Sequence, residues 1–167
     1  MAKFVEMQVD SIRVHMPSGQ HVVILKEKDA ERFLPIWIGI YEANAIALKI
    51  TNITPERPIT HDLLANILQS ADMKLKKIQV TALTNEVFYA RLFIGIDGKD
   101  VEIDSRPSDA IALAVRLTCP ILVAQEVLDK AGVLPEKEED EEKLTVFKDL
   151  VNNMDLPDLE GPPPEKS

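Results

Sequence analysis

The stretch from Met73 to Ser105 most constrains how this chain folds, because three β-type runs follow one another with only short connections. The runs cover residues 73–83, 86–96 and 99–105, and they are rich in β-branched, aromatic or alternating apolar residues. Asp-Gly-Lys at 97–99 marks a tight turn between the last two runs. These runs therefore predict a meander of three strands.

The segments on either side of this meander carry their own patterns of apolar residues. Alternating apolar residues predict strands, and apolar residues spaced three and four apart predict helices. Strands are expected over residues 3–16, 21–27, 34–40 and 119–124, and helices over 41–52, 60–71, 107–117 and 125–132. Thr60 is expected to cap the second helix, Pro107 to begin the third, and Gly132 to end the fourth.

Composition changes after Pro135, which places the domain boundary there. Residues 1–134 are expected to fold as one domain, residues 135–155 as an acidic amphipathic helix, and residues 156–167 as a disordered tail. The apolar stripe of that helix packs either on its own domain or on a partner chain. The expected core of the domain comprises Trp37, Ile46, Leu64, Ile67, Ile111 and Val115.

Charge and cysteine content limit the classes of protein that fit. The net charge is −9, concentrated in residues 136–142 and after Asp155, which argues against general electrostatic attraction to nucleic acid. A single cysteine, Cys119, excludes an intramolecular disulfide and a cysteine metal cluster. The amino terminus has no signal pattern and no apolar run approaches a membrane span. We therefore expect a cytoplasmic protein that does not enter a membrane.

Polar residues gather where three of the expected helices start. They are Glu42 and Asn44 at the first, Arg57, Thr60, His61 and Asp62 at the second, and Asp104, Arg106, Ser108 and Asp109 at the third. Free N–H groups at helix starts favour anions. A phosphodiester hydrolase needs cations or a metal, a general base and a leaving-group acid, and these residue types supply that chemistry if they meet in space.

Each of these residues also has a structural interpretation. Asp62 and Asp109 fall in first turns, where the helix dipole alone favours a carboxylate. Arg106 is able to pair with Glu42 or Asp104.

Glu102 and Asp104 project to the same side of their strand, and that face is a candidate for holding Mg²⁺ or Mn²⁺.

Several ordered motifs resemble the bifunctional nuclease family. They are "LPIWIGIYEANAIAL", "RPITHDLLANIL" and "IDSRPSDAIALAVR" followed by "PILVAQEVLDKAG", and the resemblance covers roughly residues 5–132. It implies a roll-like α+β domain on a largely antiparallel sheet, a tendency to form homo-oligomers, and cleavage of DNA and RNA as described for plant members. The motif residues are Glu42, Arg57, Thr60, His61, Asp62, Asp104, Arg106, Ser108 and Asp109.

Two functions follow from these observations. The first is a metal-dependent nuclease acting on DNA and RNA with Mg²⁺ or Mn²⁺. Its expected catalytic residues are Glu42, His61, Asp62, Asp104, Ser108 and Asp109, with Arg57 and Arg106 binding substrate and Asp104 and Asp109 binding the metal. The second is a non-enzymatic oligomeric module that binds an anionic ligand or a protein partner.

Overall fold

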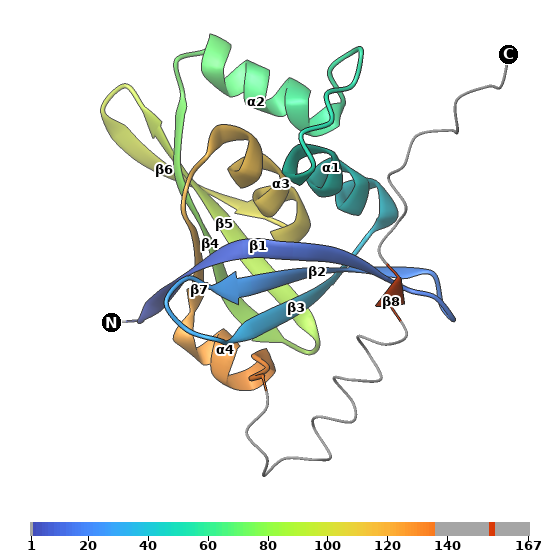
Figure 1. Cartoon of the computed structure of the whole chain (residues 1–167). Coiled ribbons are helices and arrows are strands. Elements are labelled where there is room, and N and C mark those ends of the chain that lie inside the picture. The colour runs from blue at the N-terminus through green and yellow to red at the C-terminus, as the bar shows by residue number, and fades with distance from the viewer. Residues whose placement is uncertain (1, 136–153, 156–167) are drawn as a thin grey trace, which may run out of the picture.

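The protein is described by a computed structural model that covers residues 2–135 and 154–155. It is an α+β fold, as the sequence predicts, built on a mostly antiparallel open sheet (Figure 1). The strands are β1 (Phe4–His15), β2 (Gln20–Glu27), β3 (Phe33–Ile38), β4 (Lys74–Thr84), β5 (Val87–Ile96), β6 (Lys99–Ser105), β7 (Ile121–Ala124) and β8 (Met154–Asp155). The helices are α1 (Ile40–Ile50), α2 (Thr60–Ser70), α3 (Pro107–Leu117) and α4 (Gln125–Ala131).

The sheet has the order β3-β2-β1-β7-β4-β5-β6, with β8 added beside β1. Neighbouring strands are antiparallel except β4 and β7, which run parallel. The predicted meander is confirmed as β4-β5-β6. Asp97 and Gly98 between β5 and β6 both have positive φ, 49° and 74°, as a two-residue hairpin turn requires.

One arrangement of elements occurs twice and brings the helix starts together. Three antiparallel strands followed by a helix appear as β1-β2-β3-α1 and again as β4-β5-β6-α3. In both units the helix follows the strand at the outer end of the sheet. Helices α1 and α3 contact each other, α2 packs against α3, and all three lie on one side of the sheet, with α4 on the other (Figure 1).

Alanine lets α1 and α3 approach closely over the centre of the core. Helix α1 buries Ala43, Ala45 and Ala47 around Ile46, and α3 buries Ala110, Ala112 and Ala114 around Ile111. Small side chains bring two helix backbones near each other, while Ile46 and Ile111 are fully buried in the core. The expectation that Ile46 and Ile111 are core residues is confirmed.

Three other expected core residues are exposed instead. Trp37 is 46% exposed, Leu64 40% and Ile67 49%, so their assignment to the core is wrong. Helix α2 buries only His61 and Ala65, because its inner side contacts α3 along one narrow stripe. The apolar residues beside that stripe face a groove, which is described below.

The end of the chain differs in part from the expectation. Gly132 ends α4 as predicted, whereas residues 136–153 and 156–167 lie outside the described residues. Met154 and Asp155, expected at the end of a helix, form strand β8 opposite His15 and Val14. The pairing of β1 with β7 stops at Met7. Val14 and His15 lie beyond that point, so their backbone groups on the β7 side of β1 are free to pair with β8. Within the described residues no helix combines the length and apolar character that a membrane span requires.

A strained helix end gives the first testable prediction. Thr118, the C-cap residue of α3, has φ 55° and ψ 51°, a left-handed conformation that is costly for a β-branched residue. We expect Thr118→Gly to raise the free energy of unfolding by about 0.5–1 kcal/mol in urea denaturation. The same change at Thr51, the C-cap of α1 with φ −93°, is the control, and it is expected to lower stability. Equal effects at both positions would contradict the strain at Thr118.

Candidate functional site

Three of the four acidic residues expected at the site hold equivalent positions in three helices. Glu42, Asp62 and Asp109 are each the third residue of α1, α2 and α3. Carboxylates in a first turn are stabilised by the positive end of the helix dipole, which accounts for their presence. Their partners, rather than their positions, distinguish their roles.

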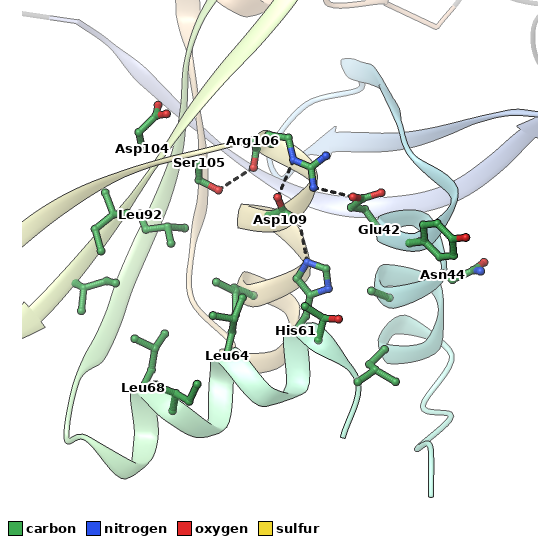
Figure 2. Close-up of a pocket in the computed structure, with 18 of the residues that line it drawn as sticks. Glu42, Asn44, His61, Leu64, Leu68, Leu92, Asp104, Ser105, Arg106 and Asp109 are labelled. Atoms are coloured by element: carbon green, nitrogen blue, oxygen red, sulfur yellow. Dashed lines mark hydrogen bonds and ion pairs between the residues drawn. The ribbon is translucent and has the colours of Figure 1, made fainter. Parts of the chain in front are cut away.

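Arg106 joins two of these carboxylates. Its Nη2 donates to Glu42 Oε1 at 2.6 Å and its Nε donates to Asp109 Oδ2 at 2.8 Å (Figure 2). Arg106 precedes α3 as its N-cap residue, so its side chain starts beside α1 and spans the gap between the two helices. Gly39 stands before α1, and a Cβ at that position would collide with the Glu42 carboxylate. The missing side chain at residue 39 therefore makes room for Glu42 to fold back toward Arg106.

His61 completes this arrangement from the first turn of α2. The residue is only 6% exposed, and its Nε2 lies 2.8 Å from Asp109 Oδ1. Burial alone would raise the pKa of Asp109, but hydrogen bonds from Arg106 and His61 outweigh it and lower that pKa. Asp109 is therefore ionised at neutral pH and acts as an acceptor. Because an ionised carboxylate only accepts hydrogen bonds, His61 Nε2 donates this one, and Nδ1 is the other ring nitrogen.

We call Glu42, His61, Arg106 and Asp109 the polar cluster, and it stands at one end of a pocket of about 720 Å³. The rest of this pocket is mainly apolar, and one wall comes from α2 while the other comes from β5 and β6. These apolar walls include Leu64, Ile67, Leu68, Leu92, Ile94 and Ile103. Figure 2 shows Leu64 and Leu68 on α2 opposite Leu92, with the polar cluster beyond them. The site therefore combines a charged end with an apolar trough.

Other expected site residues lie away from the polar cluster. Asp104 is among the residues that line the pocket, but it lies opposite Arg91 in the β5–β6 register, on the opposite face of the sheet from Ile103, and its side chain points away from Arg106 in Figure 2. Ser108 is buried in α3 and does not line the pocket. Arg57 is exposed on the loop before α2 and also lies outside the pocket lining. The structure thus brings together four of the eight expected site residues.

Asp62 belongs to a separate arrangement around Arg116, which the sequence analysis missed. Arg116 Nε donates to Asp62 Oδ1 at 2.7 Å, and its two terminal nitrogens donate to the carbonyls of Ala112 and Ala45, each at 2.9 Å. The other Asp62 oxygen accepts the N–H of Ile59 at 3.0 Å. Ile59, rather than Thr60, is therefore the N-cap residue of α2. Arg116 connects all three helices.

The carboxylates near the pocket do not form a ready-made metal site. No three His, Cys, Asp or Glu side chains gather into a group that could hold a metal ion within residues 2–135 and 154–155. Both oxygens of Asp109 already accept hydrogen bonds, and Asp104, its expected partner as a ligand, faces the other side of the sheet. The cationic group that these carboxylates bind is therefore the guanidinium of Arg106, which contacts Glu42 and Asp109.

The lowered carboxylate pKa values predict how stability depends on pH. For Asp62, burial alone would raise the pKa, but the Ile59 N–H and Arg116 outweigh it and lower the pKa, as Arg106 and His61 do for Asp109. Their contribution to the free energy of unfolding is complete above the ordinary value of 3.8 and is lost as the pH falls below it. We expect urea denaturation between about pH 5 and pH 2 to show this loss, and Asp62→Asn to reduce it. An unchanged pH dependence of the unfolding free energy in Asp62→Asn would contradict the contribution assigned to Asp62.

Comparison with known proteins identifies relatives of this chain. Residues 23–136 match the model of the bifunctional nuclease domain. An uncharacterized protein of Mycobacterium tuberculosis is 40% identical over 144 residues, which cover 86% of both chains. Bifunctional nuclease 1 of Arabidopsis thaliana is 29% identical over 119 residues, 64% of this chain and 37% of that protein. Bifunctional nuclease 1 of Oryza sativa subsp. indica is 24% identical over 126 residues, 73% of this chain and 38% of that protein.

These matches confirm the resemblance seen in the motifs. The chain spans under two fifths of the plant proteins' length, whereas it covers most of the mycobacterial relative. The family model extends from β2 through β3, α1, the meander and α3 to the end of α4, and it includes every residue of the polar cluster. The chain belongs to the bifunctional nuclease domain family.

Proposed function

We propose that this protein hydrolyses phosphodiester bonds of nucleic acids at the polar cluster. One observation carries the proposal: Asp109 holds a cation, Arg106, and a histidine, His61, on its two oxygens at the mouth of a pocket. A phosphate-binding cation and a proton acceptor are two of the groups that the reaction needs. Membership of the family and the names of the plant relatives support the same activity.

Arg106 is the group that binds the phosphate in this proposal. Its side chain is 66% exposed, and Nη1 makes no hydrogen bond within the described residues. Glu42 and Asp109 fix the other two nitrogens and so hold the guanidinium plane in place. A diester oxygen is able to accept from Nη1 and from the free N–H groups at the start of α3. These contacts reach the backbone of the substrate rather than its bases, which fits action on both DNA and RNA.

His61 is the group that moves the proton. With Nε2 held by Asp109, Nδ1 accepts a proton from the attacking hydroxyl or water and later returns it to the leaving oxygen. Asp109 orients the ring and stabilises the positive charge that develops on it. Glu42 acts as a positioning residue, because it touches Arg106 and lies at the start of α1.

The requirement for Mg²⁺ or Mn²⁺ stays a prediction from the sequence. Since the carboxylates described above do not form a ready-made site, no step of this proposal passes through a metal ion. The requirement is tested separately by comparing cleavage with Mg²⁺, with Mn²⁺ and with excess chelator. Loss of cleavage in chelator, restored by either ion, is the result the sequence predicts.

Purified protein and labelled oligonucleotides test the activity itself. We expect cleavage of single-stranded DNA and RNA oligonucleotides by the wild type, and an unchanged rate for Asp104→Asn, whose side chain faces the other side of the sheet. Asp104→Asn thus separates this site from the one expected from sequence, in which Asp104 is catalytic. Absence of cleavage of both substrates by the wild type in all three metal conditions would overturn the proposal.

A binding module without catalysis is the second candidate, favoured by charge. The chain carries a net charge of −9, and two carboxylates surround the one arginine of the cluster. Both features weaken attraction to a polyanion. This candidate predicts no cleavage under any condition.

Self-association and a cytoplasmic location also stay predictions. Sedimentation at micromolar concentration tests the first of them, because a monomer of this chain is 18.7 kDa. A larger species supports the homo-oligomer, and a single species of monomer mass contradicts it. Residues 136–153, which include most of the expected C-terminal helix, are the segment to delete when asking whether that helix contacts a partner chain.

A further inference from the structure

The apolar trough beside the polar cluster lies along the open edge of the sheet. Strand β6 is the last strand at its end of the order, and within the described residues no strand pairs with its outer side. An edge strand presents unpaired N–H and C=O groups that are able to bind another strand. Helix α2 stands beside this edge, because its residues Leu64 and Ile67 line the same pocket as Ile103 of β6.

The two faces of β6 differ sharply in character. Val101 and Ile103 pair with Ile94 and Leu92, so they lie on the helix side of the sheet, and both remain exposed. In a strand added to this edge, every second side chain would lie on the helix side of the sheet. These side chains would contact Val101 and Ile103 of β6 on one side and Leu64 and Ile67 of α2 on the other. Those side chains must therefore be apolar.

The other face of β6 is a row of acidic residues, namely Asp100, Glu102 and Asp104. Lys76 reaches Asp100 and Arg91 binds Glu102 at 2.7 Å, both from the inner strands, while Asp104 has no ion pair within the described residues. A second copy of β6 paired antiparallel would bring acidic residues opposite acidic residues, which is destabilising. A strand with basic residues on this face would instead place them opposite the acidic residues of β6, which stabilises the pairing.

We propose that the groove between β6 and α2 docks an extended peptide segment of a partner protein, in which apolar and basic residues alternate. The segment adds a strand to β6, with its apolar side chains against α2 and its basic side chains along the acidic row. The acidic row attracts the basic side chains of such a segment electrostatically. This proposal does not depend on catalysis, since it concerns the trough and the edge rather than His61.

A fluorescein-labelled peptide of alternating valine and lysine is the probe, and its anisotropy reports binding to the full-length protein. The matched peptide of alternating valine and glutamate is expected not to bind. Ile67→Glu puts a charge into the groove and is expected to weaken binding about tenfold or more. Leu63→Glu, also exposed on α2 but outside the pocket lining, is expected to leave binding unchanged. Both positions are on the surface, so folding is preserved in both variants.

Backbone methylation distinguishes strand addition from simple apolar contact. Peptides methylated on the nitrogens of alternate residues fall into two sets, and only one set loses the N–H groups that face β6. We expect one set to lose binding and the other to keep it. Equal binding of both sets, or equal binding of the two α2 variants, overturns the proposal.

Two other occupants of the groove give different results. If the protein is a dimer that Ile67→Glu dissociates and Leu63→Glu does not, a second copy covers the groove and the proposal is wrong. If the peptide fails to bind while Ile67→Glu lowers affinity for a single-stranded oligonucleotide, the trough belongs to the nuclease substrate and the proposal is again wrong. Loss of cleavage activity with intact peptide binding, by contrast, would refute only the proposed nuclease function.

Discussion

Asp109→Asn is expected to lower the rate of phosphodiester cleavage by about 10²–10⁴-fold, the range that general acid–base groups contribute. The amide keeps the size of the carboxylate but has only one acceptor oxygen, whereas Asp109 accepts from both His61 and Arg106. One of these two partners must therefore lose its hydrogen bond. The ring of His61 is then free to take the wrong tautomer, or the guanidinium of Arg106 is free to turn.

The measurement is the rate per folded molecule, since Asp109 also stabilises the start of α3. We expect an accompanying stability loss of about 1 kcal/mol, the usual value of a charge in a first turn. Asp104→Asn is the matched control, because it makes the same chemical change five positions away on the other face of the sheet. A full rate in Asp109→Asn after correction for folding would show that Asp109 is only a structural residue.

Arg116→Ala is expected to lower the free energy of unfolding by about 2–3 kcal/mol, less than the loss of a fully buried ion pair because the Asp62 carboxylate is partly exposed. The Arg116 side chain is only 6% exposed, and its removal leaves the Asp62 carboxylate without its cation and takes the second donor from two helix carbonyls. Arg116→Lys should recover only part of the loss, because an ammonium group cannot reproduce the three directions of the guanidinium.

Urea denaturation at neutral pH measures this effect. The control is Arg57→Ala, since Arg57 is exposed and forms no ion pair within the described residues, and we expect a change within about 0.5 kcal/mol. A similar small loss in Arg116→Ala would mean that the three helices do not depend on this arginine for their packing.

Local sequence patterns predicted the elements because each carried its own signal. The meander followed from short connections and Asp97-Gly98, and α3 followed from Pro107 at its start. The exposure of Leu64 and Ile67 did not follow, because periodicity shows that a helix has an apolar face and not what covers it. Here the apolar face of α2 lines a groove together with β5 and β6 instead of a core.

The site was predicted in part for a similar reason. Glu42, Arg106 and Asp109 lie at helix starts, and the sequence itself offers Glu42 as one of two pairing partners for Arg106. The direction of Asp104 depends on which face of β6 the helices cover, which only the register with β5 decides. Arg116 gave one weak signal, a cation in the last turn of a helix, and nothing local revealed that it reaches two other helices.

The central claim is that His61 and Asp109 act together on the scissile phosphate. A double-mutant cycle on the cleavage rate tests it most directly, with His61→Gln, Asp109→Asn and the two combined, each corrected for the folded fraction. Residues that act as one unit lose activity non-additively, so we expect the double variant to be about as slow as either single one. Losses that multiply, or a single variant with the wild-type rate, would contradict the claim.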